Sequence, residues 1–185
     1  MPYDLPATVA EIERQLADGG WDQPQRLYAL VHTGRLRETE PGLADLLADS
    51  DADSLTPVEQ DAIDGDVAEF LSGIEWPAAV DGCALVNEVV LLPDGAAQER
   101  PDGVDESEWA EAHPDARDVR LVVGVLRGGE RASVLRIRGV DGGADDVLAA
   151  PDLVPNLALA LLATLGELPD DLADDPADDP ADEPD

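Results

Sequence analysis

The sequence predicts an α+β fold, a two-layer sandwich in which about four mostly antiparallel strands are covered by helices on one face. Three patterns predict it. Apolar residues recur at helical spacing near the start and end of the folded part, one long apolar segment is typical of a central strand, and two alternating segments flank a Gly-Gly turn. At 185 residues and 44% hydrophobic content, the chain is large enough for one core, which we expect within residues 1–165.

The first expected element is a helix over residues 6–17, because Val9, Ile12 and Leu16 fall on one apolar stripe and a Gly-Gly pair follows. A helix start is also predicted at Thr56, since a proline and a glutamate follow it at the spacing of a capping box. The remaining expected elements are strands at 26–31, 83–92 and within 117–138, short helices at 40–47 and 106–112, and an apolar helix at 155–165.

Residues 117–138 predict a β-hairpin with Gly128-Gly129 in its turn. A two-residue loop would pair Leu121 with Arg136 and mix arginines with valines on both faces. A three-residue loop with a bulged glycine instead gathers the aliphatic residues on one face, and burying arginine is costly, so we expect the bulged register. The opposite face then carries Arg120, Arg136 and Arg138 with Val122 and Val134.

Arginines form a distinctive cluster in a chain that has no lysine and a formal net charge of -32. Three of them, Arg120, Arg136 and Arg138, could clamp a phosphate or a carboxylate-bearing partner. The same groups could instead neutralise the protein's own acids or lie over apolar surface. Trp109 lies on a long connection between strands, where it could anchor a partner, so the candidate anion- or partner-binding residues are these three arginines and Trp109.

No catalytic, cofactor or metal motif is readable, so we expect no enzyme, no cofactor and no metal. His32, Cys83 and His113 are widely spaced and lack a metal-site signature. The acidic segment at 49–53 lacks the glycine and the terminal glutamate of a calcium loop. Residues 166–185 hold ten acids, no base and regularly spaced prolines, which predicts a disordered acidic tail.

Composition also limits partners and location. The excess of carboxylates would repel DNA and anionic membranes, so we expect no direct nucleic-acid binding. No apolar run reaches the roughly 18 residues of a spanning helix, so we expect no membrane insertion. The N-terminus has no secretory pattern and Cys83 has no second cysteine with which to form an internal disulfide, which favours the cytoplasm.

Several motifs in order carry a resemblance to a known family. They are Trp21-Asp22-Gln23-Pro24-Gln25-Arg26-Leu27-Tyr28-Ala29-Leu30-Val31, Thr56-Pro57-Val58-Glu59-Gln60-Asp61, Ile74-Glu75-Trp76-Pro77, Gly82-Cys83-Ala84-Leu85, His113-Pro114-Asp115 and Val125-Leu126-Arg127. The chain resembles a family of uncharacterised actinobacterial proteins over nearly its whole length except the tail. The resemblance implies a bacterial cytoplasmic protein and carries no assigned activity.

The leading hypothesis is a non-enzymatic protein-interaction module, of the adaptor or chaperone type, that binds another protein through its sheet face and mobile connection. The first alternative is a protein that binds a small phosphate or carboxylate ligand on the arginine-bearing face. The second alternative is an acidic mimic of nucleic acid, which rests on the acidity of the chain alone.

Overall fold

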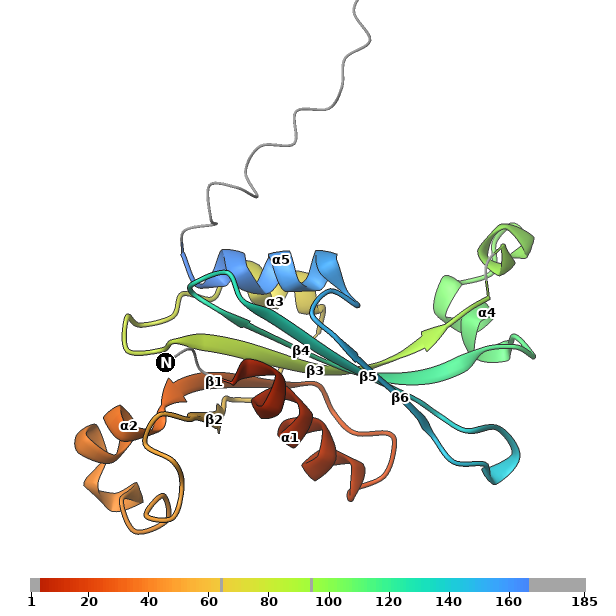
Figure 1. The fold of residues 1–185 in the computed structure, drawn as a ribbon. Helices are drawn as coiled ribbons and strands as arrows, with labels where there is room; N and C mark the ends of the chain where they lie inside the picture. The colour runs from red at the N-terminus through yellow and green to blue at the C-terminus, as the bar shows by residue number, and fades with distance from the viewer. Residues whose placement is uncertain (1–3, 64, 94, 167–185) are drawn as a thin grey trace, which may run out of the picture.

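The computed structural model describes residues 4–63, 65–93 and 95–166, and these contain one six-stranded sheet in the order β2-β1-β3-β4-β5-β6 (Figure 1). Every neighbouring pair is antiparallel. The strands are β1 Arg26–His32, β2 Leu55–Glu59, β3 Gly82–Leu91, β4 Arg117–Leu126, β5 Arg131–Ile137 and β6 Asp146–Ala150. The predicted α+β class is therefore confirmed, with six strands in place of about four. The predicted disorder of the tail falls almost entirely on residues 167–185, which lie outside the described residues.

Helices cover both faces of the sheet, so the expectation that they cover one face is wrong (Figure 1). Helix α1, Leu5–Ala17, lies on one face, and α5, Pro155–Thr164, lies with α3, Val67–Ser72, on the other. Two further short helices, α2 Thr33–Thr39 and α4 Glu106–Ala112, lie toward opposite ends of the sheet. The physical reason is that β3 and β4 are apolar on both sides, and each side needs its own cover.

Two separate apolar clusters result. Beneath α5, the cluster includes Cys83, Leu85, Val123 and Leu161. A second cluster lies beneath α1. Its strand side chains alternate along the strands with those of the first cluster, and they pack against the apolar stripe of α1 that contains Val9. The sheet is therefore the middle layer of the central part of the molecule.

The hairpin register predicted from the sequence is confirmed. Leu121 pairs with Leu135, and Val119 pairs with Ile137. The backbone N–H of Leu126 donates to the carbonyl of Glu130 at 3.0 Å and closes a three-residue loop. Gly129 takes a φ of +89°, the left-handed conformation that the bulged turn requires.

Helix α1 approaches the sheet closely because β4 has a glycine below it. A Cβ atom on Gly124 would lie 2.5 Å from Cγ2 of Val9 and 3.2 Å from Cδ1 of Leu5. The helix is started by Asp4, whose Oδ1 accepts from the N–H of Ala7 at 3.0 Å. Together these contacts fix the position of the first turn of α1, including Pro6, over the sheet.

The predicted helix start at Thr56 is wrong, because this segment is the edge strand β2. Thr56 pairs with Val31 of β1, and its hydroxyl lies 2.8 Å from that of Thr33. Pro57 has no N–H to donate, but an edge strand tolerates it. The short helix expected at 40–47 is a 3-10 turn at Pro41–Leu43, preceded by the unpredicted α2.

Candidate functional site

The structure brings the three predicted arginines together on the face of the sheet that α1 covers. Arg120 of β4 pairs with Arg136 of β5, and Arg138 follows two residues later on the same face. The side chain of Trp21 contacts two of them, with its ring centroid 5.1 Å from Cζ of Arg120 and 5.5 Å from Cζ of Arg138. The grouping that the sequence predicted is therefore present, with Trp21 as an additional member.

We expected the arginine-bearing face of the hairpin to be an exterior surface, but Arg120 is buried, with 1% of the residue exposed. Its Nε and Nη2 donate to Oε1 of Glu88 at 2.9 and 2.6 Å, and Nη2 also donates to the carbonyl of Gly20. Glu88 in turn accepts from the backbone N–H of Asp22 at 2.8 Å. The pair is thus a buried ionic contact that attaches the segment after α1 to the sheet.

Arg136 and Arg138 are also partnered. Arg136 donates to Oε1 and Oε2 of Glu13 at 2.5 and 3.0 Å and lies 3.5 Å from Oδ2 of Asp145. Hydrogen bonds to Glu13 raise the pKa of Arg136, and the backbone N–H of Gly139 lowers the pKa of Asp145. Arg138 binds the exposed Asp118 at 3.0 Å. These contacts favour the alternative in which the arginines neutralise the protein's own acids.

Trp109 lies on α4, and its indole N–H donates to the carbonyl of Ala96 at 3.1 Å. Its ring also meets that of His113 edge-on at 5.6 Å. The indole is therefore held by residues of the β3–β4 connection. A partner-binding role for Trp109 and the three arginines stays a prediction.

The two edges of the sheet differ in chemistry. The outer side of β2 carries Pro57 at the middle of the strand, which removes one donor from that edge. At the other end of the sheet, β6 pairs with β5 on one side and has no strand on its other side in the described part of the chain. We call this outer side of Asp146–Ala150 the open edge.

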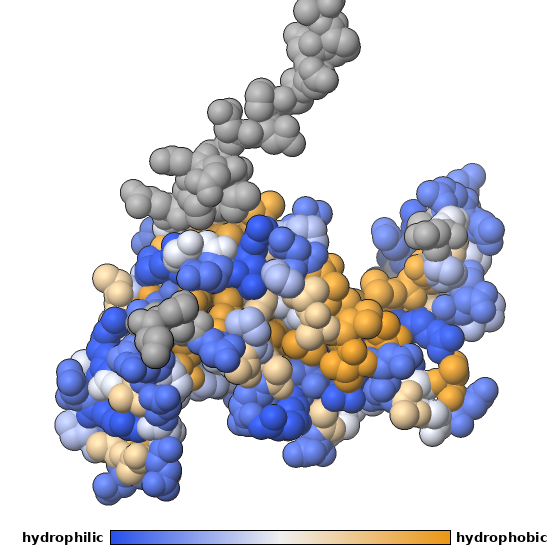
Figure 2. Space-filling model, in the orientation of Figure 1, coloured by the Kyte–Doolittle hydropathy of each residue, from blue (hydrophilic) through white to orange (hydrophobic). Residues whose placement is uncertain are grey.

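The open edge is flanked by exposed aliphatic side chains. Val147 is 49% exposed and Leu148 48% exposed, and because they alternate along β6 they lie on opposite faces. Figure 2 shows hydrophobic surface over β5 and β6, beside the end of α5. No proline or charged residue interrupts the strand between Asp146 and its end at Ala150. An added strand would find free backbone groups and apolar contacts on both faces.

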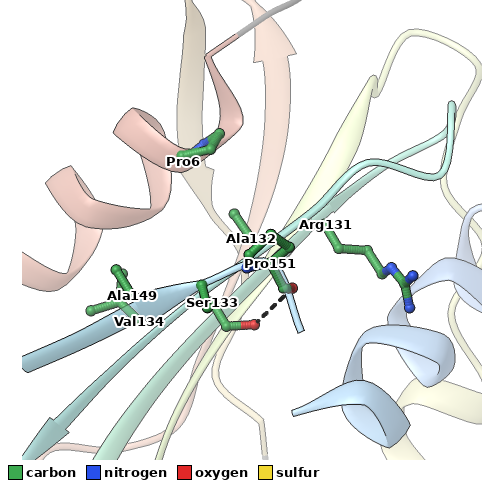
Figure 3. A pocket seen from close by; sticks show the side chains of 8 residues that line it. Pro6, Arg131, Ala132, Ser133, Val134, Ala149 and Pro151 are labelled. Carbon is green, nitrogen blue, oxygen red and sulfur yellow. Dashed lines mark hydrogen bonds between the residues drawn. The ribbon is translucent and has the colours of Figure 1, made fainter. Parts of the chain in front are cut away.

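A cavity of about 250 Å³ opens beside β6, between the first turn of α1 and the β5–β6 pair (Figure 3). The figure shows Pro6 on the α1 side of the cavity and Arg131 extending toward α5. Arg131 binds Oδ1 of Asp152 at 3.0 Å, and the hydroxyl of Ser133 donates to the carbonyl of Pro151 at 3.4 Å. The lining residues are Pro6, Arg131, Ala132, Ser133, Val134, Ala149, Ala150 and Pro151.

In the described residues, no group of three or more His, Cys, Asp and Glu side chains is placed to hold a metal ion. None of the described helices has the length and apolar character needed to cross a membrane.

Comparison with protein families gives one result. Residues 5–166 match the family described as PPA1309-like protein. The chain belongs to this family. No curated protein and no solved structure matches the chain. The PPA1309-like match begins with α1 and ends just after α5, so it includes the open edge and the cavity. The description of the PPA1309-like family names no activity, and the functional argument therefore depends on the geometry.

The single thiol of this PPA1309-like chain should be unreactive in the native protein. Burial raises the pKa of Cys83 to about 12, and its Sγ lies 3.8 Å from the carbonyl of Leu161 and from the hydroxyl of Thr164. At pH 8 the thiolate, which is the reactive species, is therefore about 10⁻⁴ of the native population. We expect a disulfide reagent to label Cys83 completely in denaturant and negligibly over an hour without it. Fast labelling of the native protein would contradict the burial.

Proposed function

We propose that the chain is a non-enzymatic protein-interaction module that binds an extended segment of another protein along the open edge of β6. The observation that carries the proposal is the contrast between the two edges of one sheet. The β2 edge is obstructed by Pro57, whereas β6 offers uninterrupted backbone groups between two exposed aliphatic side chains. Addition of a strand to such an edge is a common mode of peptide recognition.

The charges around β6 indicate the kind of segment. The exposed Asp146 lies at the start of the strand, and the residues from Val147 to Ala150 are apolar. Asp145 and Asp152, on either side of the strand, already pair with Arg136 and Arg131, so the attraction depends mainly on the charge of the whole chain. The whole chain carries a net charge of -32, so a positively charged segment is attracted and a second copy of the chain is repelled. We therefore propose a partner segment with aliphatic residues at its centre and Arg or Lys at its ends.

The arginine face supports the alternative function less well. A small anion bound by Arg120 would have to displace Glu88, which already makes two hydrogen bonds to that guanidinium. Removing one partner of a buried ion pair costs several kcal/mol. The lone cysteine and the resemblance to bacterial proteins support placing the interaction in a bacterial cytoplasm.

Selection from a displayed library of random short peptides tests the proposal. We expect the selected peptides to share alternating aliphatic residues with flanking Arg or Lys, and to slow hydrogen exchange of amides in Asp146–Ala150. Leu148→Lys places a charge beside the bound strand and should weaken binding at least roughly tenfold. Leu46→Lys is the matched control, because Leu46 is 80% exposed on a distant loop, and it should bind as the wild type does.

Three results would overturn the proposal. The first is that no peptide is enriched, or that enriched peptides protect amides elsewhere and not in β6. The second is that Leu148→Lys binds them as well as the Leu46→Lys control. The third is a wild-type dimer in sedimentation that Leu148→Lys dissociates, because the occupant of the edge would then be a second copy.

A further inference from the structure

We infer that the cavity beside Pro6 is a specificity pocket that accepts one aliphatic side chain of the bound segment. The inference rests on the proposed function, and it goes further by naming the feature of the partner that the protein reads. Backbone pairing at β6 would accept almost any extended sequence, so selectivity needs a place where a side chain is recognised. The cavity lies next to the open edge, with Ala149 and Ala150 of β6 in its lining.

The register of the sheet places the cavity where a partner side chain would point. Ala149 pairs with Val134, and Ala132 pairs with Gly124, so these residues lie on the face that α1 covers. A strand added to β6 directs every second side chain to that same face. Those side chains would lie beside Ala149, at the mouth of the cavity.

The hollow exists because small side chains meet the end of a helix. α1 packs mainly against β4 and β5, and its first turn, with Pro6, overhangs the sheet on the side toward β6. On the face that α1 covers, the alanines at 132 and 149 leave the space below this turn unfilled. A leucine or valine in place of Ala149 would reach into it.

The volume and the lining restrict what can bind there. About 250 Å³ is below the roughly 300–1,000 Å³ of pockets that hold small molecules, and it is sufficient for one large aliphatic side chain. The polar groups at its border are engaged, since Arg131 binds Asp152 and Ser133 binds the carbonyl of Pro151. A charged or amide side chain would therefore be buried without a partner, which is costly.

The test fills the cavity with a larger side chain of the protein itself. Ala149 is exposed, so Ala149→Leu can occupy the hollow without displacing the core, and Ala149→Ser is the control that leaves it open. The probe is a peptide selected on the wild-type protein, together with versions in which each aliphatic residue in turn is alanine. One such replacement should weaken binding to the wild type and to Ala149→Ser by roughly 10- to 100-fold. On Ala149→Leu the original peptide should lose affinity by a similar factor, and the alanine version should bind at least as well as the original.

The failures of the two proposals look different. If the peptide protects β6 from exchange but Ala149→Leu leaves its side-chain preference unchanged, the pocket inference is wrong and edge binding stands. If the peptide does not protect β6 in the wild type, edge binding itself is wrong. Thermal unfolding of both variants near the wild-type midpoint shows that a lost preference does not come from a damaged fold.

Discussion

Replacing Arg120 with methionine should lower the free energy of unfolding by about 3–5 kcal/mol, one of the two largest effects we expect from a single substitution. Methionine keeps much of the apolar stem but removes the charge that faces Glu88. The carboxylate of Glu88, whose side chain is 17% exposed, would then lose its only ionic partner among the described residues. The carbonyl of Gly20 would lose the guanidinium and keep only the side-chain amide of Gln23 as a donor, at 2.8 Å. Equilibrium unfolding in urea, followed by circular dichroism, measures the difference.

Arg138→Met is the matched control. Arg138 also stacks on Trp21 and binds a carboxylate, but it and Asp118 are about half exposed, and exposed ion pairs contribute roughly 0–1 kcal/mol. The double variant Glu88→Gln with Arg120→Met should recover part of the loss, because it leaves no buried charge unpaired. If Arg120→Met were as mild as Arg138→Met, the ionic contact would have no structural importance and Arg120 would be available for an external anion.

The elements that the sequence predicted best are those whose pattern is local. The stripe of Val9, Ile12 and Leu16 identifies α1, and the separation of aliphatic from arginine side chains selects the register of the β4–β5 hairpin. The register is right although Arg120 is buried, because Glu88 pairs with its charge. Both features follow from residues close together in the sequence and do not depend on distant segments. For the same reason Thr56-Pro57-Val58-Glu59 was misleading: its capping-box spacing is local, while its pairing with β1 depends on residues far away in the sequence.

The candidate site depended on information that the local pattern does not contain. Alternation along β4 and β5 correctly places Arg120, Arg136 and Arg138 on one face. It does not indicate whether that face is covered, and α1 covers it with Glu13 directed at Arg136. Glu13, a partner of Arg136, lies on the N-terminal helix, and Glu88, the partner of Arg120, lies on β3, at separations of 123 and 32 residues.

The open edge was missed because β6 is only five residues long. A signal for it is present, since Val147-Leu148-Ala149-Ala150 is a short apolar run between an aspartate and a proline. Its importance follows only from its place in the sheet. The same run between two other strands would be part of the core, whereas at the end of the order β2-β1-β3-β4-β5-β6 it presents unpaired backbone groups.

Leu161→Ala should lower the free energy of unfolding by about 2–5 kcal/mol and should also expose the thiol below it. Leu161 is fully buried at the centre of the cluster beneath α5, and its carbonyl is in contact with Sγ of Cys83. Truncation leaves a cavity between α5 and β3. The helix can move to close it only in part, because Leu162, Leu165 and the hydrogen bond between Trp76 and Thr164 hold α5 in place. Leu46→Ala, on the exposed loop, should change stability by less than about 0.5 kcal/mol.

The rate at which Cys83 is labelled distinguishes global unfolding from detachment of α5 alone. If the thiol becomes accessible only by global unfolding, a loss of about 3 kcal/mol should raise its labelling rate roughly 100-fold, in step with the unfolding equilibrium. If α5 detaches alone, the rate should rise by more than the measured change in global stability, because the Leu161→Ala substitution weakens the docking of that helix directly. Detachment of α5 alone would also affect the open edge, because only Pro151–Val154 joins β6 to α5. Asp152 in that link binds Arg131 at the border of the cavity. An unchanged rate together with an unchanged free energy of unfolding would contradict the packing of α5 on β3.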